Sequence, residues 1–147
     1  MTARIALLDV NVLVALFDAD HPHHEPAHDW LVANRGSGWA TCPLTENGLV
    51  RILSNVAYSG SPLPPDAVRE RLNAFCESGQ HEFYADDVSL RQTTLFKLAG
   101  VTHRKLTDVY LLGLARHHGG RLATFDRGVL WDAVVGATPE HLEVIPA

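Results

Sequence analysis

The sequence predicts an α/β fold with a central, mainly parallel twisted sheet that helices cover on both faces. Short apolar runs with the length of buried strands alternate with longer segments of helical periodicity, and turn-forming residues separate them. The chain has 147 residues, of which 46% are hydrophobic, enough for one domain with its own core. We therefore expect residues 1–147 to form a single domain, with its chemistry beyond the carboxyl ends of the strands.

The N-terminal part is expected to begin with a buried strand at residues 5–8, an apolar run that stops at Asp9. A short helix over residues 12–17 follows, which places Asp9 at the junction of the two elements. A second helix is expected from Pro26 to Asn34 and ends at Gly36, because proline suits a first turn and apolar residues recur there with helical spacing.

The middle of the chain is expected to contribute a strand at residues 39–42 and a helix that Thr45 caps and that runs to about Asn55. Glu46 lies in the first turn of that helix. The pattern then predicts a helix over residues 66–77 and a strand over residues 82–84.

The C-terminal part is expected to contain two more helices. Ser89 can cap one over residues 90–99, and Thr107 can cap the other, which places Asp108 in its first turn. Gly119 and Gly120 end the second helix. The remaining elements are a strand at residues 121–125, directly before Asp126, and a last strand at residues 142–145.

Four carboxylates are thereby expected at one edge of the sheet. Asp9 and Asp126 follow strands, while Glu46 and Asp108 begin helices. Taken singly, three of them have ordinary explanations as helix-terminal or turn residues. Asp9 is harder to explain in this way, because an ionised carboxylate in an apolar stretch is destabilising unless it is paired, hydrogen-bonded or bound to a metal.

Together, the four acids indicate a divalent metal site. Carboxylates that share a pocket raise one another's pKa, so a cluster that stays ionised requires counter-charge. Oxygen ligands without convergent cysteine favour Mg²⁺ or Mn²⁺, which can activate water and stabilise the leaving oxygen in phosphodiester hydrolysis. The net charge of −5 does not exclude a nuclease, because such a site contributes negative charge itself and bound cations reverse its local sign.

The remaining composition indicates a soluble protein of a reducing cytoplasm. The two cysteines, Cys42 and Cys76, lie far apart without paired Cys/His spacing, so neither a disulfide framework nor a structural zinc site is expected. The apolar runs are too short for a signal peptide or a membrane span.

The four acids stand in motifs that resemble those of PIN domains, particularly the VapC toxins of type II toxin–antitoxin systems. The resemblance covers nearly the whole chain. The motifs are, in order, Leu7-Leu8-Asp9-Val10-Asn11-Val12-Leu13, Pro43-Leu44-Thr45-Glu46 with Arg51 further along, Leu106-Thr107-Asp108-Val109-Tyr110-Leu111, and Ala123-Thr124-Phe125-Asp126.

The resemblance implies a PIN-like three-layer α/β/α fold and a Mg²⁺-dependent endoribonuclease, with Mn²⁺ as a possible substitute. Asp9, Glu46, Asp108 and Asp126 would bind metal or activate the attacking water. The substrate would be RNA, with unpaired nucleotides favoured. A VapB-type antitoxin protein that covers the acidic site, and a homodimer, are also implied.

Each of the other candidate residues has two possible roles. Asn11 either orients Asp9 or a water at the site, or caps the adjacent helix. Thr124 either hydrogen-bonds into the site or is only a β-branched strand residue. Arg51 and Arg127 either contact phosphate or pair with nearby surface acids. The histidine-rich segment His21–His28 is not expected to form a dedicated metal site, although it can touch RNA.

Two other functions are compatible with parts of the sequence. Strand-end aspartates also act as nucleophiles in haloacid-dehalogenase-like phosphatases, but those proteins carry Asp-x-Asp-x-Thr where this chain has Asn11 and Leu13 after Asp9. A PIN-like module that binds RNA or protein without catalysis is the second alternative. Measuring metal binding together with metal-dependent RNA cleavage distinguishes these two functions from that of a ribonuclease.

Overall fold

A computed structural model describes residues 4–59 and 61–147, and its centre is a five-stranded sheet in the order β3-β2-β1-β4-β5. Each strand pairs with its neighbours in parallel. The strands are β1 (Ala6–Leu8), β2 (Trp39–Thr41), β3 (His81–Phe83), β4 (Arg121–Thr124) and β5 (Leu142–Val144). The predicted α/β fold with a parallel sheet is confirmed.

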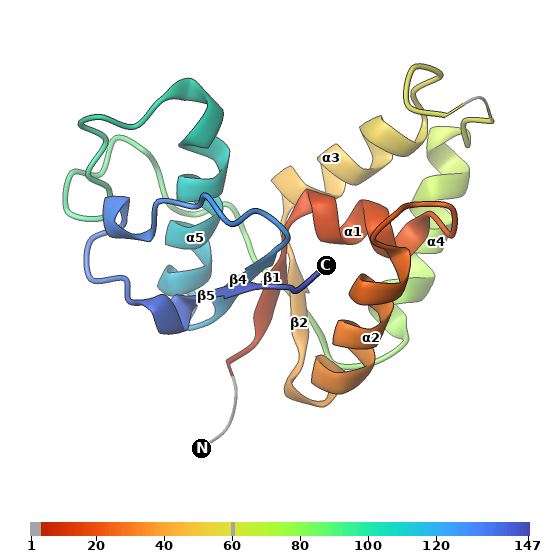
Figure 1. Ribbon diagram of the computed structural model, residues 1–147, viewed down its shortest axis with the longest axis horizontal. Coiled ribbons are helices and arrows are strands. Elements are labelled where there is room, and N and C mark those ends of the chain that lie inside the picture. The colour runs from red at the N-terminus through yellow and green to blue at the C-terminus, as the bar shows by residue number, and fades with distance from the viewer. Residues whose placement is uncertain (1–3, 60) are drawn as a thin grey trace.

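Helices cover both faces of this sheet, which gives three layers (Figure 1). Helices α1 to α4 lie on one side, and α5 lies on the other with the loops that precede and follow it. Within the described ranges, none of the helices has the length and apolar composition needed to cross a bilayer. The helices are α1 (Val10–Phe17), α2 (His24–Asn34), α3 (Pro43–Leu53), α4 (Pro65–Glu77) and α5 (Leu106–His117), with 3₁₀ turns at Arg35–Ser37, His103–Lys105, Trp131–Ala133 and Pro139–His141.

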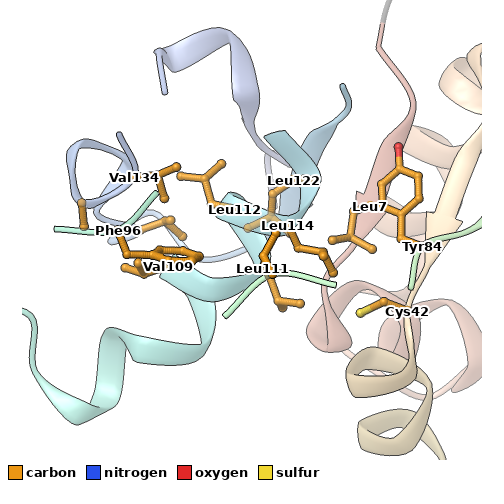
Figure 2. Close-up of a cluster of buried hydrophobic side chains, with 14 of the residues drawn as sticks. Leu7, Cys42, Tyr84, Phe96, Val109, Leu111, Leu112, Leu114, Leu122 and Val134 are labelled. Atoms are coloured by element: carbon orange, nitrogen blue, oxygen red, sulfur yellow. The ribbon is translucent and has the colours of Figure 1, made fainter. Parts of the chain in front are cut away.

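Strand β1 separates two hydrophobic layers, because successive side chains of a strand point to opposite faces. Leu7 belongs to the layer under α5, together with Leu114 (Figure 2). Ala6 and Leu8 belong to the layer under α1 to α4. Asp9 follows this fully buried strand directly, so the strand's packing fixes the position from which its carboxylate emerges.

Helix α1 begins two residues earlier than predicted, and helix α3 begins three residues earlier. Helix α1 starts at Val10 because the Asp9 side chain itself accepts the first free N–H. Helix α3 starts at Pro43, whose missing N–H leaves no bond unmade at that position. Thr45 therefore lies inside the first turn, where its hydroxyl accepts the N–H of Cys42 at 3.1 Å.

Helix α5 also begins ahead of its predicted cap. A 3₁₀ turn at His103–Lys105 leads directly into Leu106, so Thr107 lies within the helix and does not cap it. Asp108 nevertheless stands in the first turn, as predicted.

The helix predicted over residues 90–99 is wrong. This segment forms turns and then an isolated antiparallel bridge between Phe96 and Val134. The N–H of Lys97 donates to the carbonyl of Ala133 at 2.7 Å. Backbone groups that pair with a distant segment cannot also close a helix, and the sequence pattern did not reveal this tertiary pairing.

Candidate metal centre

Asp9 lies at the carboxyl end of β1 with its side chain almost entirely buried. The residue is 6% exposed. Its Oδ1 accepts the N–H of Val10 at 2.7 Å, and its Oδ2 accepts the hydroxyl of Thr124 at 2.8 Å. Burial raises the pKa of Asp9 above its ordinary value, and these two hydrogen bonds oppose that rise. An ionised Asp9 is therefore held by donors on two sides.

Thr124 and Asn11 form a small network behind this carboxylate. The parallel register pairs Leu8 with Ala123, which places Thr124 beside Asp9 on the neighbouring strand. The Thr124 hydroxyl also accepts the side-chain N–H of Asn11 at 3.2 Å and the backbone N–H of Asp126 at 3.1 Å. The cap of α1 is Asp9, so Asn11 contacts β4 and the loop after it instead of capping the helix.

Asp108 and Asp126 approach each other at the same edge. Burial is the main reason that the pKa of Asp108 is raised to about 7; its hydrogen bond with Asp126 and the charges of Asp9 and Asp126 add to this. The pKa of Asp126 is lowered, first because its Oδ1 accepts the N–H of Gly128 at 2.7 Å. The three aspartates therefore form one electrostatic unit, in which the pKa values of Asp9 and Asp108 are raised and that of Asp126 is lowered.

Two of these aspartates border a surface hollow of about 650 Å³. These two are Asp9 and Asp108. Tyr58 also lines the hollow, and its hydroxyl donates to the carboxylate of Asp18 at 2.5 Å. The other lining residues are mainly apolar or uncharged polar: Val10, Asn11, Val14, His21, Ile52, Asn55 and Ala57.

Glu46 takes a different position from the three aspartates. It accepts the Thr41 hydroxyl at 2.7 Å, and Thr41 lies 2.7 Å from Nε2 of His81. Glu46 lines the hollow between α3 and α4 that also includes Arg69, and not the hollow of Asp9. Sequence reasoning missed this Thr41–His81 support; a threonine at the end of an otherwise apolar strand was its available signal.

The sequence profile of the PIN domain matches residues 6–134. This span runs from β1 to the Phe96 bridge partner Val134 and includes all four predicted acids. The chain belongs to the PIN-domain family.

This PIN domain is also similar to three curated ribonucleases of Mycobacterium tuberculosis. It is 40% identical to Ribonuclease VapC44 over 141 residues, 95% of the chain and 99% of VapC44. It is 47% identical to Ribonuclease VapC38 over 125 residues (85% and 87%) and 43% identical to Ribonuclease VapC29 over 123 residues (84% and 86%). The resemblance to VapC ribonucleases that the motifs indicated is confirmed.

The basic residues around the aspartates differ from those the sequence suggested. Arg51 and Arg127 are exposed, and neither makes an ion pair with any residue in the described parts of the chain. The positive charge that acts on the aspartates is that of Lys105, which lowers the pKa of both Asp108 and Asp126. Sequence reasoning missed Lys105, although its place directly before α5 and two residues ahead of Thr107 was a usable signal.

The histidine-rich segment of this PIN domain lies beside the same hollow. His21 lines the hollow, and the ring of His23 stacks on Phe125 with centroids 5.0 Å apart. His24 contacts the carbonyl of Ala15 through Nδ1 at 2.7 Å. These contacts connect the segment to α1 and to the residue before Asp126.

The aspartate cluster fits a divalent cation. A carboxyl pKa of about 7 at Asp108 shows that burial and neighbouring acids outweigh the nearby positive charge of Lys105. Carboxylate oxygens are the ligands that Mg²⁺ and Mn²⁺ prefer, and a divalent ion supplies the counter-charge that the cluster lacks. Asp9, Asp108 and Asp126 are the side chains that could hold it.

Proposed function

We propose that this PIN domain is a Mg²⁺-dependent endoribonuclease and the toxin of a VapBC-type toxin–antitoxin system, with residues 1–147 acting as one domain. Ribonuclease activity, hydrolysis of RNA, is supported by its VapC relatives. The observation that carries the proposal is the convergence of Asp9, Asp108 and Asp126 at one edge of the sheet.

Asp9 and Asp108 are the principal metal ligands in this proposal, and Glu46 and Asp126 complete the site. A bound Mg²⁺ would offset charge at the scissile phosphate and lower the pKa of the attacking water. Mn²⁺ is compatible with the same oxygen donors. Thr124 and the N–H of Val10 favour the ionised form of Asp9 against the effect of burial, and they fix both of its oxygens before metal arrives.

The protein's own proton chemistry centres on Asp108. Near neutral pH its carboxyl holds a proton in part of the molecules, through its bond with Asp126. That proton must leave for both carboxylates to act as ligands, so metal affinity rises with pH. Lys105 favours the ionised forms of both acids and also presents a cation to an approaching phosphate.

The substrate in this proposal is single-stranded or looped RNA that lies in the hollow beside Asp9. His21 and Tyr58 on its walls offer rings against which an unpaired base can stack. Arg51 and Arg127 are exposed and without ion-pair partners in the described ranges, so they remain candidates for phosphate contacts. Asn11 and Thr124 act indirectly, by holding Asp9.

A VapB-type antitoxin is the proposed protein partner, a homodimer the proposed assembly, and the cytoplasm the proposed compartment. These follow from the similarity to the VapC proteins. The antitoxin would cover the acidic hollow and offer a basic side chain to the aspartates, since these have little counter-charge of their own.

The proposal is tested by incubating the purified protein with total bacterial RNA. We expect fragments with Mg²⁺ or Mn²⁺, no fragments with a chelator, and none with the Asp9→Asn variant. Asp29→Asn, a change of an exposed aspartate on α2, is the matched control and should cleave normally. Cleavage that survives both the chelator and Asp9→Asn would contradict the proposal, and RNA binding without cleavage would favour the non-catalytic module.

A further inference from the structure

The C-terminal end of α5 carries a second group of metal-ligating side chains. Nε2 of His118 lies 3.0 Å from Oδ1 of Asp87, and Nε2 of His117 lies 3.7 Å from the same oxygen. All three potential ligand atoms lie within 4.8 Å of one another. Asp87 belongs to the segment after β3, so the group joins two parts of the chain that are distant in sequence.

This group is separate from the aspartate centre. His117 follows Asp108 by nine residues on the same helix, which corresponds to about 14 Å along its axis. Its donors also differ, because two imidazoles and one carboxylate suit a borderline ion such as Zn²⁺, whereas carboxylates alone suit Mg²⁺.

We propose that Asp87, His117 and His118 form a Zn²⁺ site with water as the fourth ligand. Ligand atoms 2.0–2.1 Å from a tetrahedral zinc ion lie about 3.4 Å from one another. The two distances to Asp87 Oδ1, 3.0 and 3.7 Å, lie on either side of this value. The two imidazole nitrogens lie within 4.8 Å of each other, and the side chain of His117 is 43% exposed, so it has room to adjust to a bound ion.

His118 is held in place for this role by its surroundings. Its ring stacks on Tyr84 with centroids 4.2 Å apart and an angle of 11° between the planes. Its Nε2 also lies 3.2 Å from the carbonyl of Ala85. The carbonyl and the Asp87 carboxylate are both acceptors, so zinc binding at Nε2 requires the ring to carry its proton on Nδ1 instead.

Zinc at this position would tie the segment after β3 to the end of α5. The ligands come together only in the folded chain, so bound zinc stabilises the folded state. The expected role is structural, because the site is remote from Asp108 and the metal would fasten two elements that otherwise meet through the Tyr84–His118 stack and the bonds from His118 to Ala85 and Asp87.

The test is calorimetric titration of chelator-treated protein with Zn²⁺, in the presence of excess Mg²⁺ to occupy carboxylate sites. Loss of a supporting group alone costs a metal site about 10–100-fold in affinity, so His117→Ala should weaken zinc binding by at least about 100-fold. His103→Ala, which removes an exposed histidine near the opposite end of α5, should bind zinc as the wild type does. Asp9→Asn should also retain this zinc site.

Thermal melting and NMR give two further tests of whether zinc binds at these histidines. Zn²⁺ should raise the melting temperature of the wild type but not of His117→Ala, and it should shift the imidazole NMR signals of His117 and His118. Unchanged zinc affinity in His117→Ala overturns the proposal. Zinc binding that is lost instead in a His24→Ala, His28→Ala double variant overturns it as well, because the ion would then occupy the histidine-rich segment.

Discussion

Thr124 donates its hydroxyl to Asp9 at 2.8 Å, from the end of β4 to the end of the neighbouring β1. The same oxygen accepts the N–H groups of Asn11 and Asp126, so one threonine connects Asp9 with the loop that carries another acid. The position is fully buried. The geometry of the aspartate centre thus depends on the register of two central strands.

Thr124→Val tests this connection, because valine keeps the shape and removes the hydroxyl. We expect Mg²⁺ affinity to fall by about 10–100-fold, since Asp9 loses a group that orients it. Loss of a buried hydrogen-bond partner should lower the free energy of unfolding by about 1–3 kcal/mol. Isothermal titration and chemical denaturation measure the two effects. Thr124→Ser retains the hydroxyl and should bind Mg²⁺ nearly as the wild type does; equal affinities in all three proteins would contradict the assigned role.

The stability of the metal-free protein should decrease as pH rises through the titration range of Asp108. The pKa of this group is 3.8 ordinarily and about 7 in the folded chain, so between these values the folded state binds more protons than the unfolded state. The contribution of Asp108 to the free energy of unfolding is therefore greatest below pH 3.8 and is lost as pH rises toward 7. The lowered pKa of Asp126 acts in the opposite sense, and only at acidic pH.

Melting temperatures measured in chelator from pH 5 to 8 check this prediction. The Asp108→Asn variant should show a smaller decrease over this range, because asparagine does not titrate. Mg²⁺ should restore stability at pH 8 in the wild type. Histidines with lowered pKa values, such as His21 and His81, act in the opposite sense in both proteins, so the comparison between them isolates Asp108. Parallel pH profiles for the wild type and Asp108→Asn would show that Asp108 does not have the assigned pKa.

Glu46→Gln tests whether Glu46 completes the metal site from its position beside Thr41. Glutamine keeps the size and an oxygen that can accept the Thr41 hydroxyl, while the charge is lost. If Glu46 helps to hold the cation, RNA cleavage at limiting Mg²⁺ should fall by about 10–100-fold. Thr41→Val, which keeps the Glu46 charge, should affect cleavage less. Wild-type cleavage by Glu46→Gln would restrict Glu46 to its contact with Thr41.

Gly113→Ala should destabilise the layer under α5. An added Cβ would overlap the ring of Phe96, so the segment that pairs with Val134 must shift. Overpacking of this kind costs about 1–3 kcal/mol, and the better helix propensity of alanine offsets about 1 kcal/mol. Urea denaturation should show a net loss, whereas Gly36→Ala, where no atom lies within 4 Å, should be neutral. If Gly113→Ala were as stable as the wild type, the ring of Phe96 would not pack against Gly113 in solution.

Most of the fold could be predicted from the sequence because its strands are short apolar runs and its helices repeat with a clear period. The turn formers Gly36 and Gly119 marked the ends of helical segments. The helix prediction for residues 90–99 failed because the backbone of this segment pairs with residues far along the chain, which local propensity does not encode.

Part of the candidate site could also be predicted from the sequence. Asp9, Asp108 and Asp126 follow from strand ends and a helix start, which topology brings to one edge. The orientation of Glu46 toward Thr41 and His81 depends on rotamers and on α4, and Lys105 acts through space on two acids. The sequence marks the positions of Thr41 and Lys105, but not these interactions, since they depend on side-chain packing.

The central claim is most directly tested by the single-turnover rate of cleavage of a short single-stranded RNA at saturating Mg²⁺, measured for the wild type and Asp9→Asn. Asparagine avoids the buried charge at this position, so the variant should fold, which circular dichroism can verify. We expect the rate to fall at least about a thousandfold, equivalent to about 4 kcal/mol of transition-state stabilisation. A folded Asp9→Asn protein that cleaves at the wild-type rate would contradict an aspartate-based metal centre.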